Sequence, residues 1–261
     1  RIAGVALVWS LKLQFLNLKS CLTNMSDSAN NLIHVYFMPG MAANPSIFEF
    51  IQLPEDQFKI HWLTWLIPTS NESMQDYSKR LIENIHHENI VLIGVSFGGV
   101  IVQEIAKYIK VRRLIIISSV KCRDELPKKM KFASKTGVYK ILPIGLLDYI
   151  DHLEKIAVND YLKKRAKLYR QYLSVRDKYY LSWAIQNMVN WDCSTINPEI
   201  IHIHGDKDVV FPIKYINDAI VIKGGTHVMI INRFRWFNNY LPQLILKGKE
   251  AVENNPKIIK I

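Results

Sequence analysis

Short apolar runs alternate with amphipathic stretches along the first half of the chain. The runs are rich in β-branched and aromatic residues, and the run at 89–95 is apolar almost throughout, which is typical of a strand in a parallel sheet covered on both faces. Between 72 and 87 the apolar residues instead fall at helical spacing. The pattern predicts strands at 32–38, 59–65, 89–95 and 114–119, and helices at 72–87 and directly after residue 96.

The alternation breaks between residues 121 and 192. This stretch lacks strand-like runs, and two of its segments, 161–172 and 179–191, have helix-like spacing. The sheet pattern then returns, with predicted strands at 200–204 and 219–222 and a last helix at 228–246. We therefore predict an α/β protein with a doubly wound, mostly parallel sheet, whose core comprises 25–120 and 193–261 and whose residues 121–192 form a helical cap insertion.

The two ends of the chain differ from this core. Residues 1–24 are apolar and basic, but Lys12 and Lys19 interrupt the apolar run and no clean cleavage site follows. The segment that begins at Met25 is an ordinary polar start before a strand, so we expect residues 1–24 to be an extension outside the core. The polar tail from Lys247 onwards is expected to fray.

Composition and charge narrow the class of protein. A length of 261 residues accommodates one large domain, and a hydrophobic fraction of 49% fits a soluble globular protein. The net charge of +11 is concentrated in residues 121–192, which hold 15 Lys and Arg against 8 Asp and Glu. Because these charges are interleaved with apolar residues, they indicate a solvated helical surface, with attraction to an anionic substrate or surface as the alternative. No nucleic-acid partner and no membrane span are expected, and the oligomeric state stays open.

The three cysteines, Cys21, Cys122 and Cys193, are far apart and odd in number. They form neither a disulfide framework nor a zinc motif. We therefore expect reduced thiols, no metal, and a cytoplasmic protein, with secretion directed by the N-terminal segment as the alternative.

A Gly-x-Ser-x-Gly motif lies directly between a predicted buried strand and an apolar-striped helix. It centres on Ser96, with Gly94 and Gly98 two positions to either side. A turn this sharp leaves no room for side chains at the two glycines and holds the serine hydroxyl exposed above the sheet. The N–H of Phe97, at the helix start, then lies where an oxyanion would develop. The motif predicts a nucleophilic serine, against the alternative of an ordinary glycine-rich turn.

A serine nucleophile needs a base, and the base needs a carboxylate to fix its tautomer. Asp206 and Asp208 follow the strand predicted at 200–204, and His227 follows the next strand. Because Ser96 also follows a strand, all of these residues fall at the carboxyl ends of parallel strands, where ligands bind in open α/β sheets. The sequence therefore predicts His227 as the base and one of the two aspartates as its partner.

These motifs resemble those of the α/β-hydrolase superfamily, and the resemblance spans roughly residues 32–246. In such enzymes the acid follows its strand as Gly-x-x-Asp with a later proline, which is matched at 205–212 and implies Asp208. Asp206 would then be a turn residue that bonds its own backbone. The family's Gly-x-x-His ending is matched at 224–227.

The resemblance also implies an oxyanion hole with a second N–H from the loop after the first central strand. Many relatives carry His-Gly in that loop, whereas this chain has Pro39-Gly40. The donor is a backbone group, so the departure changes little, and we assign it to Met41. The alternative is an ordinary turn with an exposed hydrophobe.

The triad implies a serine hydrolase that transfers acyl groups to water. Small carboxyl esters or thioesters are the expected substrates, because a cap encloses a pocket, and no metal or organic cofactor is implied. One alternative is related chemistry by the same triad, such as carbon–carbon bond or amide hydrolysis or a lyase step. The other is a non-enzymatic ligand-binding protein on the same fold.

The remaining chemically notable side chains have ordinary structural explanations. The histidines fall within strands or at the end of a helix, and three residues of the insertion suit either an acyl pocket or the packing of the cap. The histidines meant are five of the eight in the chain, His34, His86, His87, His202 and His204, and the three insertion residues are Trp183, Met188 and Trp191.

Overall fold

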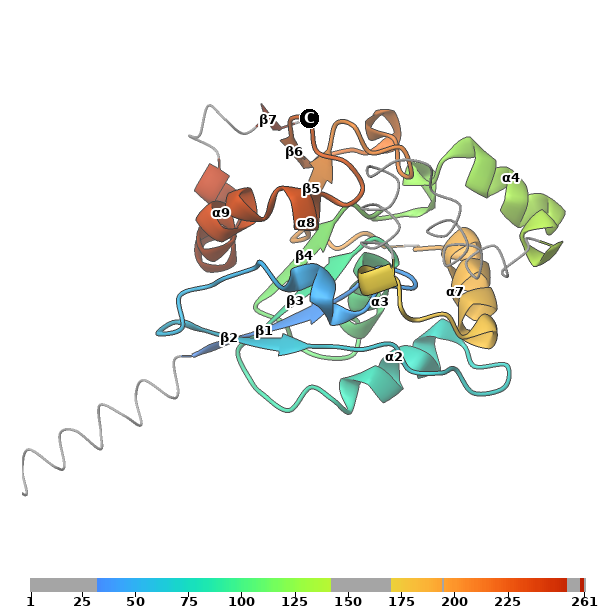
Figure 1. Ribbon diagram of the computed structural model, residues 1–261, viewed down its shortest axis with the longest axis horizontal. Helices are drawn as coiled ribbons and strands as arrows, with labels where there is room; N and C mark the ends of the chain where they lie inside the picture. The colour runs from blue at the N-terminus through green and yellow to red at the C-terminus, as the bar shows by residue number, and fades with distance from the viewer. Residues whose placement is uncertain (1–31, 142–169, 194, 253–258, 261) are drawn as a thin grey trace, which may run out of the picture.

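A twisted sheet of seven strands forms the centre of the molecule, in the order β2-β1-β3-β4-β5-β6-β7 (Figure 1). The computed structural model describes residues 32–141, 170–193, 195–252 and 259–260. The first six strands are parallel to their neighbours, and β7 is antiparallel to β6. The strands are β1 (Ile33–Met38), β2 (Phe58–Trp62), β3 (Ile90–Val95), β4 (Arg113–Ile117), β5 (Ile201–Gly205), β6 (Ile220–Ile222) and β7 (Ile259–Lys260).

Helices cover both faces of the sheet, as the apolar strands require. The helices α2 (Met74–Ile82) and α3 (Phe97–Ile105) lie on one face, and α8 (Met229–Asn232) and α9 (Phe234–Lys247) lie on the other (Figure 1). The prediction of an α/β protein with a doubly wound, mostly parallel sheet is therefore confirmed.

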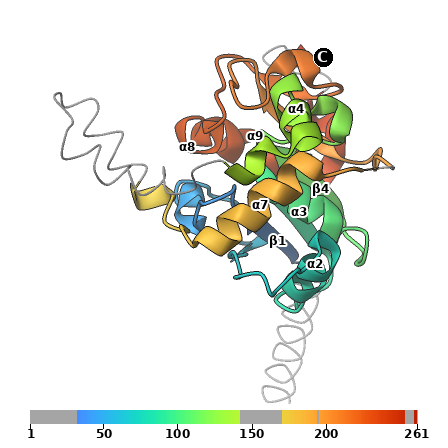
Figure 2. The same cartoon turned by 90° about the vertical axis from the view of Figure 1, so that its right-hand side faces the viewer.

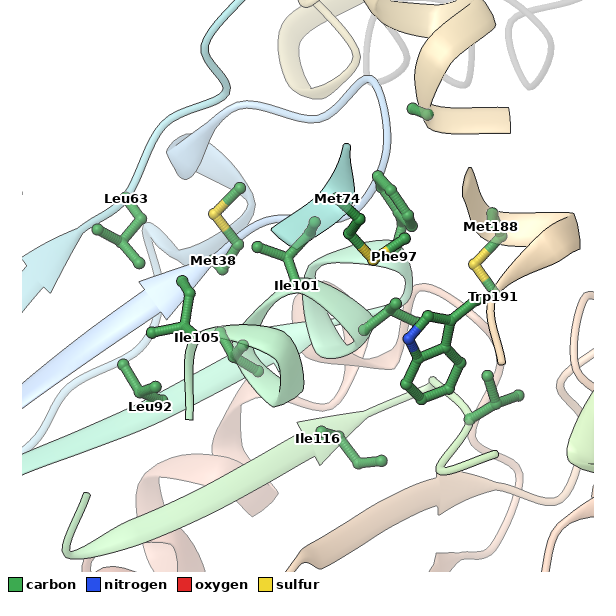
Figure 3. Packing of buried hydrophobic residues seen from close by; sticks show 14 of the residues in the cluster. Met38, Leu63, Met74, Leu92, Phe97, Ile101, Ile105, Ile116, Met188 and Trp191 are labelled. Atoms are coloured by element: carbon green, nitrogen blue, oxygen red, sulfur yellow. The ribbon is translucent and has the colours of Figure 1, made fainter. Parts of the chain in front are cut away.

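The strand residues divide by alternation between two apolar cores. Leu92 of β3 packs with Ile101 and Ile105 of α3 in the first core (Figure 3). Its neighbours Val91 and Ile93 point the other way and pack in the core that includes α9. Because both sides of each central strand are buried, the strands read as continuous apolar runs in the sequence.

The described part of residues 121–192 contains helices and no strand. The helices α4 (Lys128–Thr136) and α7 (Lys178–Asn190) contact one another at one side of the sheet (Figure 2). The helix predicted at 161–172 falls mostly outside the described residues, as does the proposed extension at 1–24. Trp183, Met188 and Trp191 are buried in the core beside α3, so the structure favours packing over pocket lining for these side chains.

Three sequence predictions are corrected by the structure. The helix predicted at 72–87 is α2 and ends at Ile82, because the chain then turns back towards β3. The single helix predicted at 228–246 is broken at Arg233 into α8 and α9. The tail predicted to fray from Lys247 continues as a short 3-10 helix and then forms β7, which pairs with the otherwise open edge of β6.

Candidate active site

Ser96 sits at a sharp turn from β3 into α3, in a backbone conformation that side chains rarely adopt. Its φ is +54° and its ψ −122°, a strained combination for a residue with a Cβ. A Cβ at Gly94 would lie 2.3 Å from the carbonyl oxygen of Gly98, and one at Gly98 would lie 2.3 Å from that of Pro39. The turn therefore needs glycine at both positions, as the motif predicts.

The backbone of Ser96 is held from the neighbouring strand. Its N–H donates to the carbonyl of Ile117 at 2.9 Å, and the Ser119 hydroxyl donates to its carbonyl at 2.7 Å. No sequence signal marks Ser119 for this role, because it lies two residues beyond the end of β4 and the Gly-x-Ser-x-Gly motif does not reveal which residue packs beside it. These bonds offset the cost of the strained turn and fix the direction of the Ser96 side chain.

The structure brings Ser96, His227 and Asp208 into one hydrogen-bonded chain. The Nε2 atom of His227 lies 3.0 Å from the Ser96 Oγ, and its Nδ1 lies 2.8 Å from the Asp208 Oδ2. With Nδ1–H donating to the carboxylate, Nε2 carries the lone pair that faces the serine hydroxyl. The arrangement allows His227 to accept a proton from Ser96.

The two aspartates of the loop after β5 have different tasks. Asp208 is buried, and its Oδ1 accepts the N–H groups of Val210 and Phe211 at 2.8 and 2.9 Å, so the carboxylate cannot rotate away from His227. Asp206 accepts the N–H of Gly224 at 2.6 Å. It therefore fastens this loop to the loop that carries His227, whereas the sequence predicts a bond to its own backbone.

A close backbone contact also joins these two loops. A Cβ at Gly205 would lie 2.3 Å from the carbonyl oxygen of Gly225. In addition, the Lys207 N–H donates to that same carbonyl at 2.9 Å. The positions of Asp208 and His227 relative to one another are thus set by backbone contacts rather than by side chains alone.

Behind Asp208 lie two histidines buried in the sheet. His204 lies with its Nε2 2.8 Å from the Phe211 carbonyl oxygen and 3.6 Å from the Asp208 Oδ2, and its Nδ1 is 3.2 Å from the Nε2 of His202. Burial lowers the pKa of His204 and holds that of His202 well below its ordinary value of 6.5. Both imidazoles therefore pack as neutral groups, in keeping with the structural role expected for them.

This burial predicts a loss of stability in mild acid. Below about pH 6.5 His202 is protonated in the unfolded state but stays neutral in the folded state, where its pKa is lower. The free energy of unfolding therefore falls as the pH falls from about 6.5 towards the pKa of the folded state. We expect His202→Gln to reduce the loss between about pH 7 and pH 5.5 by at most about 1.3 kcal/mol, measured by urea unfolding. His86→Gln, at an exposed histidine, should leave the loss unchanged, and an equal effect of both variants would contradict the assignment.

The loop after β1 lies against Ser96 and is held from several sides. A Cβ at Gly40 would be 3.3 Å from the Cβ of Ser96, and the Trp65 indole donates to the Gly40 carbonyl at 2.9 Å. In the described part of the chain no hydrogen bond occupies the N–H of Met41 or that of Phe97. Both N–H groups therefore have no hydrogen-bond partner among the described residues.

A cavity of about 290 Å³ opens at Ser96 and His227. None of its described lining residues is an Asp, Glu, Lys or Arg, and most are apolar. Tyr172 and Leu173 also line the cavity, and the Asn44 N–H donates to the Tyr172 carbonyl at 3.0 Å. The other lining residues are Gly40, Met41, Ala43, Ile47, Val95, Val228, Ile230, Ile231 and Asn232.

Within the described residues, the histidine, cysteine and carboxylate side chains around this cavity form no cluster that could hold a metal ion. None of the described helices is both long and apolar enough to cross a membrane.

The fold has many counterparts among solved structures. An esterase from Exiguobacterium antarcticum superposes with a TM-score of 0.62 at 15% identity, covering 82% of this chain and 92% of that chain. A thermophilic esterase from Thermogutta terrifontis has a TM-score of 0.60 at 16% identity, and the match covers 83% of this chain and 90% of that chain. A bromoperoxidase from Bacillus anthracis has a TM-score of 0.60 at 18% identity, and the match covers 83% of this chain and 92% of that chain. No protein-family model and no curated protein sequence matches the chain. The protein has the α/β-hydrolase fold.

Proposed function

We propose that the protein is a serine hydrolase that transfers acyl groups to water through Ser96, His227 and Asp208. The observation that carries the proposal is the unbroken chain of hydrogen bonds from the Asp208 carboxylate to the Ser96 hydroxyl, which ends in the wall of the cavity. The esterases among the structural counterparts support the same class of reaction. Residues 121–192 serve in this proposal as the cap, since Tyr172 and Leu173 contribute to the cavity.

The mechanism follows from the hydrogen bonds. His227 Nε2 takes the Ser96 proton as Oγ attacks the carbonyl carbon, and Asp208 stabilises the imidazolium that forms. The N–H groups of Met41 and Phe97 donate to the tetrahedral oxyanion. His227 then gives the proton to the leaving alcohol or thiol, which leaves an acyl group on Ser96. A water deprotonated by the same Nε2 attacks the acyl carbon, the carboxylic acid departs, and the proton returns to Oγ.

The cavity indicates what kind of acyl group is accepted. Its size suits a small substituent, and its apolar lining without Asp, Glu, Lys or Arg favours an uncharged one. Small carboxyl esters or thioesters with an apolar acyl group are therefore the proposed substrates.

Labelling with an alkyl fluorophosphonate tests the proposal directly. The probe should form a covalent adduct at Ser96 with loss of fluoride, and Ser96→Ala should abolish the adduct. Ser78→Ala is the matched control, because the Ser78 hydroxyl is buried in α2 and has no hydrogen-bond partner among the described residues. Absence of labelling in folded wild-type protein would exclude a nucleophilic Ser96.

A panel of p-nitrophenyl and CoA esters of graded length then separates the alternatives. Hydrolysis of these esters supports the proposed substrates. Labelling at Ser96 without ester hydrolysis would indicate the related chemistry, on amides or carbon–carbon bonds. Neither labelling nor turnover would favour a non-enzymatic ligand-binding protein.

Filling the cavity should change the preference for acyl length. Ile231→Phe adds bulk to the cavity wall, so we expect kcat/KM for the longest accepted ester to fall roughly tenfold or more relative to acetate, because a pocket distinguishes substrates by the few methylenes it can hold. Ile67→Phe, at a residue that is 52% exposed, makes the same change away from the cavity and should leave the preference unchanged. Equal profiles for the two variants would show that the acyl group lies elsewhere.

A further inference from the structure

Three histidines from separate parts of the chain meet near the start of β1. His34 lies in β1, His61 lies in the edge strand β2, and His87 lies in the segment between α2 and β3. In the strand register His34 pairs with Ile90 at the start of β3, whereas Ser96 follows the other end of that strand. The cluster is therefore separate from the candidate active site.

The rings are packed closely enough to share one ion. The Nδ1 of His34 and the Nε2 of His61 are 2.9 Å apart, and the rings of His34 and His87 stack with their centroids 3.8 Å apart. One ligand nitrogen from each histidine can be chosen so that all three lie within 4.8 Å of one another. Two nitrogens bound to a tetrahedral zinc ion at about 2.0–2.1 Å would lie roughly 3.3 Å apart. The nitrogens of His34 and His61 are within a few tenths of an ångström of that spacing. Nitrogens as much as 4.8 Å apart must approach by about 1.5 Å, and the stacked His87 ring must turn until its nitrogen points at the ion.

A neighbouring hydroxyl orients the third imidazole. The Tyr36 hydroxyl lies 2.6 Å from the Nδ1 of His87, which leaves the Nε2 of His87 as its ligand atom. Metal-binding histidines commonly have their second ring nitrogen held by such a partner, which fixes the tautomer and the direction of the ring. The hydroxyl of Tyr36 also accepts the His86 N–H at 3.3 Å, so this partner is itself fixed.

Metal ions bind imidazole in its neutral form, so positive charge near the cluster matters for this site. The ammonium of Lys59 faces the cluster from β2, opposite His34, but it is at the end of an exposed side chain that solvent screens.

We propose that His34, His61 and His87 bind one divalent transition-metal ion of the zinc type, with water in the remaining coordination position. Imidazole suits such ions better than it suits Mg²⁺ or Ca²⁺, which prefer oxygen ligands. The ion would link the edge strand β2, the central strand β1 and the segment before β3. Since the ligands belong to the folded state, binding stabilises the fold and does not depend on the chemistry of Ser96.

Titration with Zn²⁺ alone, at neutral pH and against a chromogenic chelator, tests the site. Wild-type protein should bind one equivalent and should melt at a higher temperature in its presence. Separate His34→Gln, His61→Gln and His87→Gln variants should each weaken binding by about tenfold or more and lose the thermal shift. The conservative Gln substitutions keep a polar side chain, and circular dichroism establishes that each variant is folded.

Two further variants locate the ion. His86→Gln changes an exposed histidine next to the cluster, and His227→Ala removes the histidine beside Ser96; both should bind Zn²⁺ as wild-type protein does. Co²⁺ bound to the wild type should give visible absorption bands that the three cluster variants lack. The proposal is overturned if wild-type protein binds no equivalent of Zn²⁺, if the folded cluster variants bind it unchanged, or if His227→Ala is the variant that abolishes binding.

Discussion

Replacing Ser96 or His227 with alanine is expected to lower kcat for ester hydrolysis by a factor on the order of 10⁴ to 10⁶, and replacing both should cost little more than replacing either. In the proposed mechanism the two side chains act as one unit, because the His227 Nε2, which lies 3.0 Å from the Ser96 Oγ, removes the serine proton as that oxygen attacks. Once one member is absent, the other has no step left to assist. The remaining turnover would come from the backbone donors and from substrate binding.

Steady-state kinetics on the best p-nitrophenyl ester, with both single variants and the double variant, measure this non-additivity. Ser78→Ala is again the control, and thermal melting shows whether each variant is folded. Losses that multiplied in the double variant would mean that the two residues act in separate steps.

Asp208→Asn is expected to lower kcat by a factor on the order of 10³ to 10⁴ while the protein stays folded. The carboxylate accepts the His227 Nδ1–H at 2.8 Å, whereas an amide can donate there and favour the wrong tautomer of the imidazole. The lone pair would then move from Nε2 to Nδ1, away from Ser96. The loss should therefore appear in kcat rather than in KM, because no substrate atom touches Asp208 in the proposed mechanism.

Asp206→Asn provides the matched control for this prediction. The side chain of Asp206 accepts the Gly224 N–H, and an asparagine can still accept that bond through its amide oxygen. Activity should fall by much less than in Asp208→Asn. If Asp206→Asn proved the more damaging change, the acid of the triad would have to be reassigned.

The sheet could be predicted from the sequence because its strands are buried on both faces. Such strands read as apolar runs whatever lies beside them, so β1, β3 and β4 were predicted to within about two residues at each end. The break between α8 and α9 and the pairing of the last strand were harder to predict. The apolar spacing continues across Arg233, where α8 ends and α9 begins, because both helices pack on the same face of the sheet. The pairing of β7 with β6 depends on a contact across the fold, which no local pattern encodes.

The residues of the candidate site likewise fall into those that a local motif predicts and those that depend on contacts across the fold. Ser96, Asp208 and His227 were accessible from the sequence because each follows a strand in a recognisable local motif, and the structure brings the three together. Tyr172 and Leu173 were not identified as cavity residues, because their place depends on how the insertion returns over the loop after β1.

The histidine cluster was missed for a related reason. His34, His61 and His87 lie in three separate elements and share no spacing, so the sequence gives no sign that they meet. The apolar spacing predicts His87 at the end of a helix, whereas α2 ends at Ile82 and His87 stacks on His34.

The backbone contact between Gly205 and Gly225 holds Asp208 and His227 together independently of residues 121–192. Asp208 and His227 follow consecutive strands and are fastened to each other there, downstream of residues 121–192. The insertion meets the cavity through Tyr172 and Leu173 but supplies none of the proposed proton-transfer groups. If the proposed function holds, exchange of that segment is expected to alter which substrates bind while Asp208 and His227 keep their relative positions.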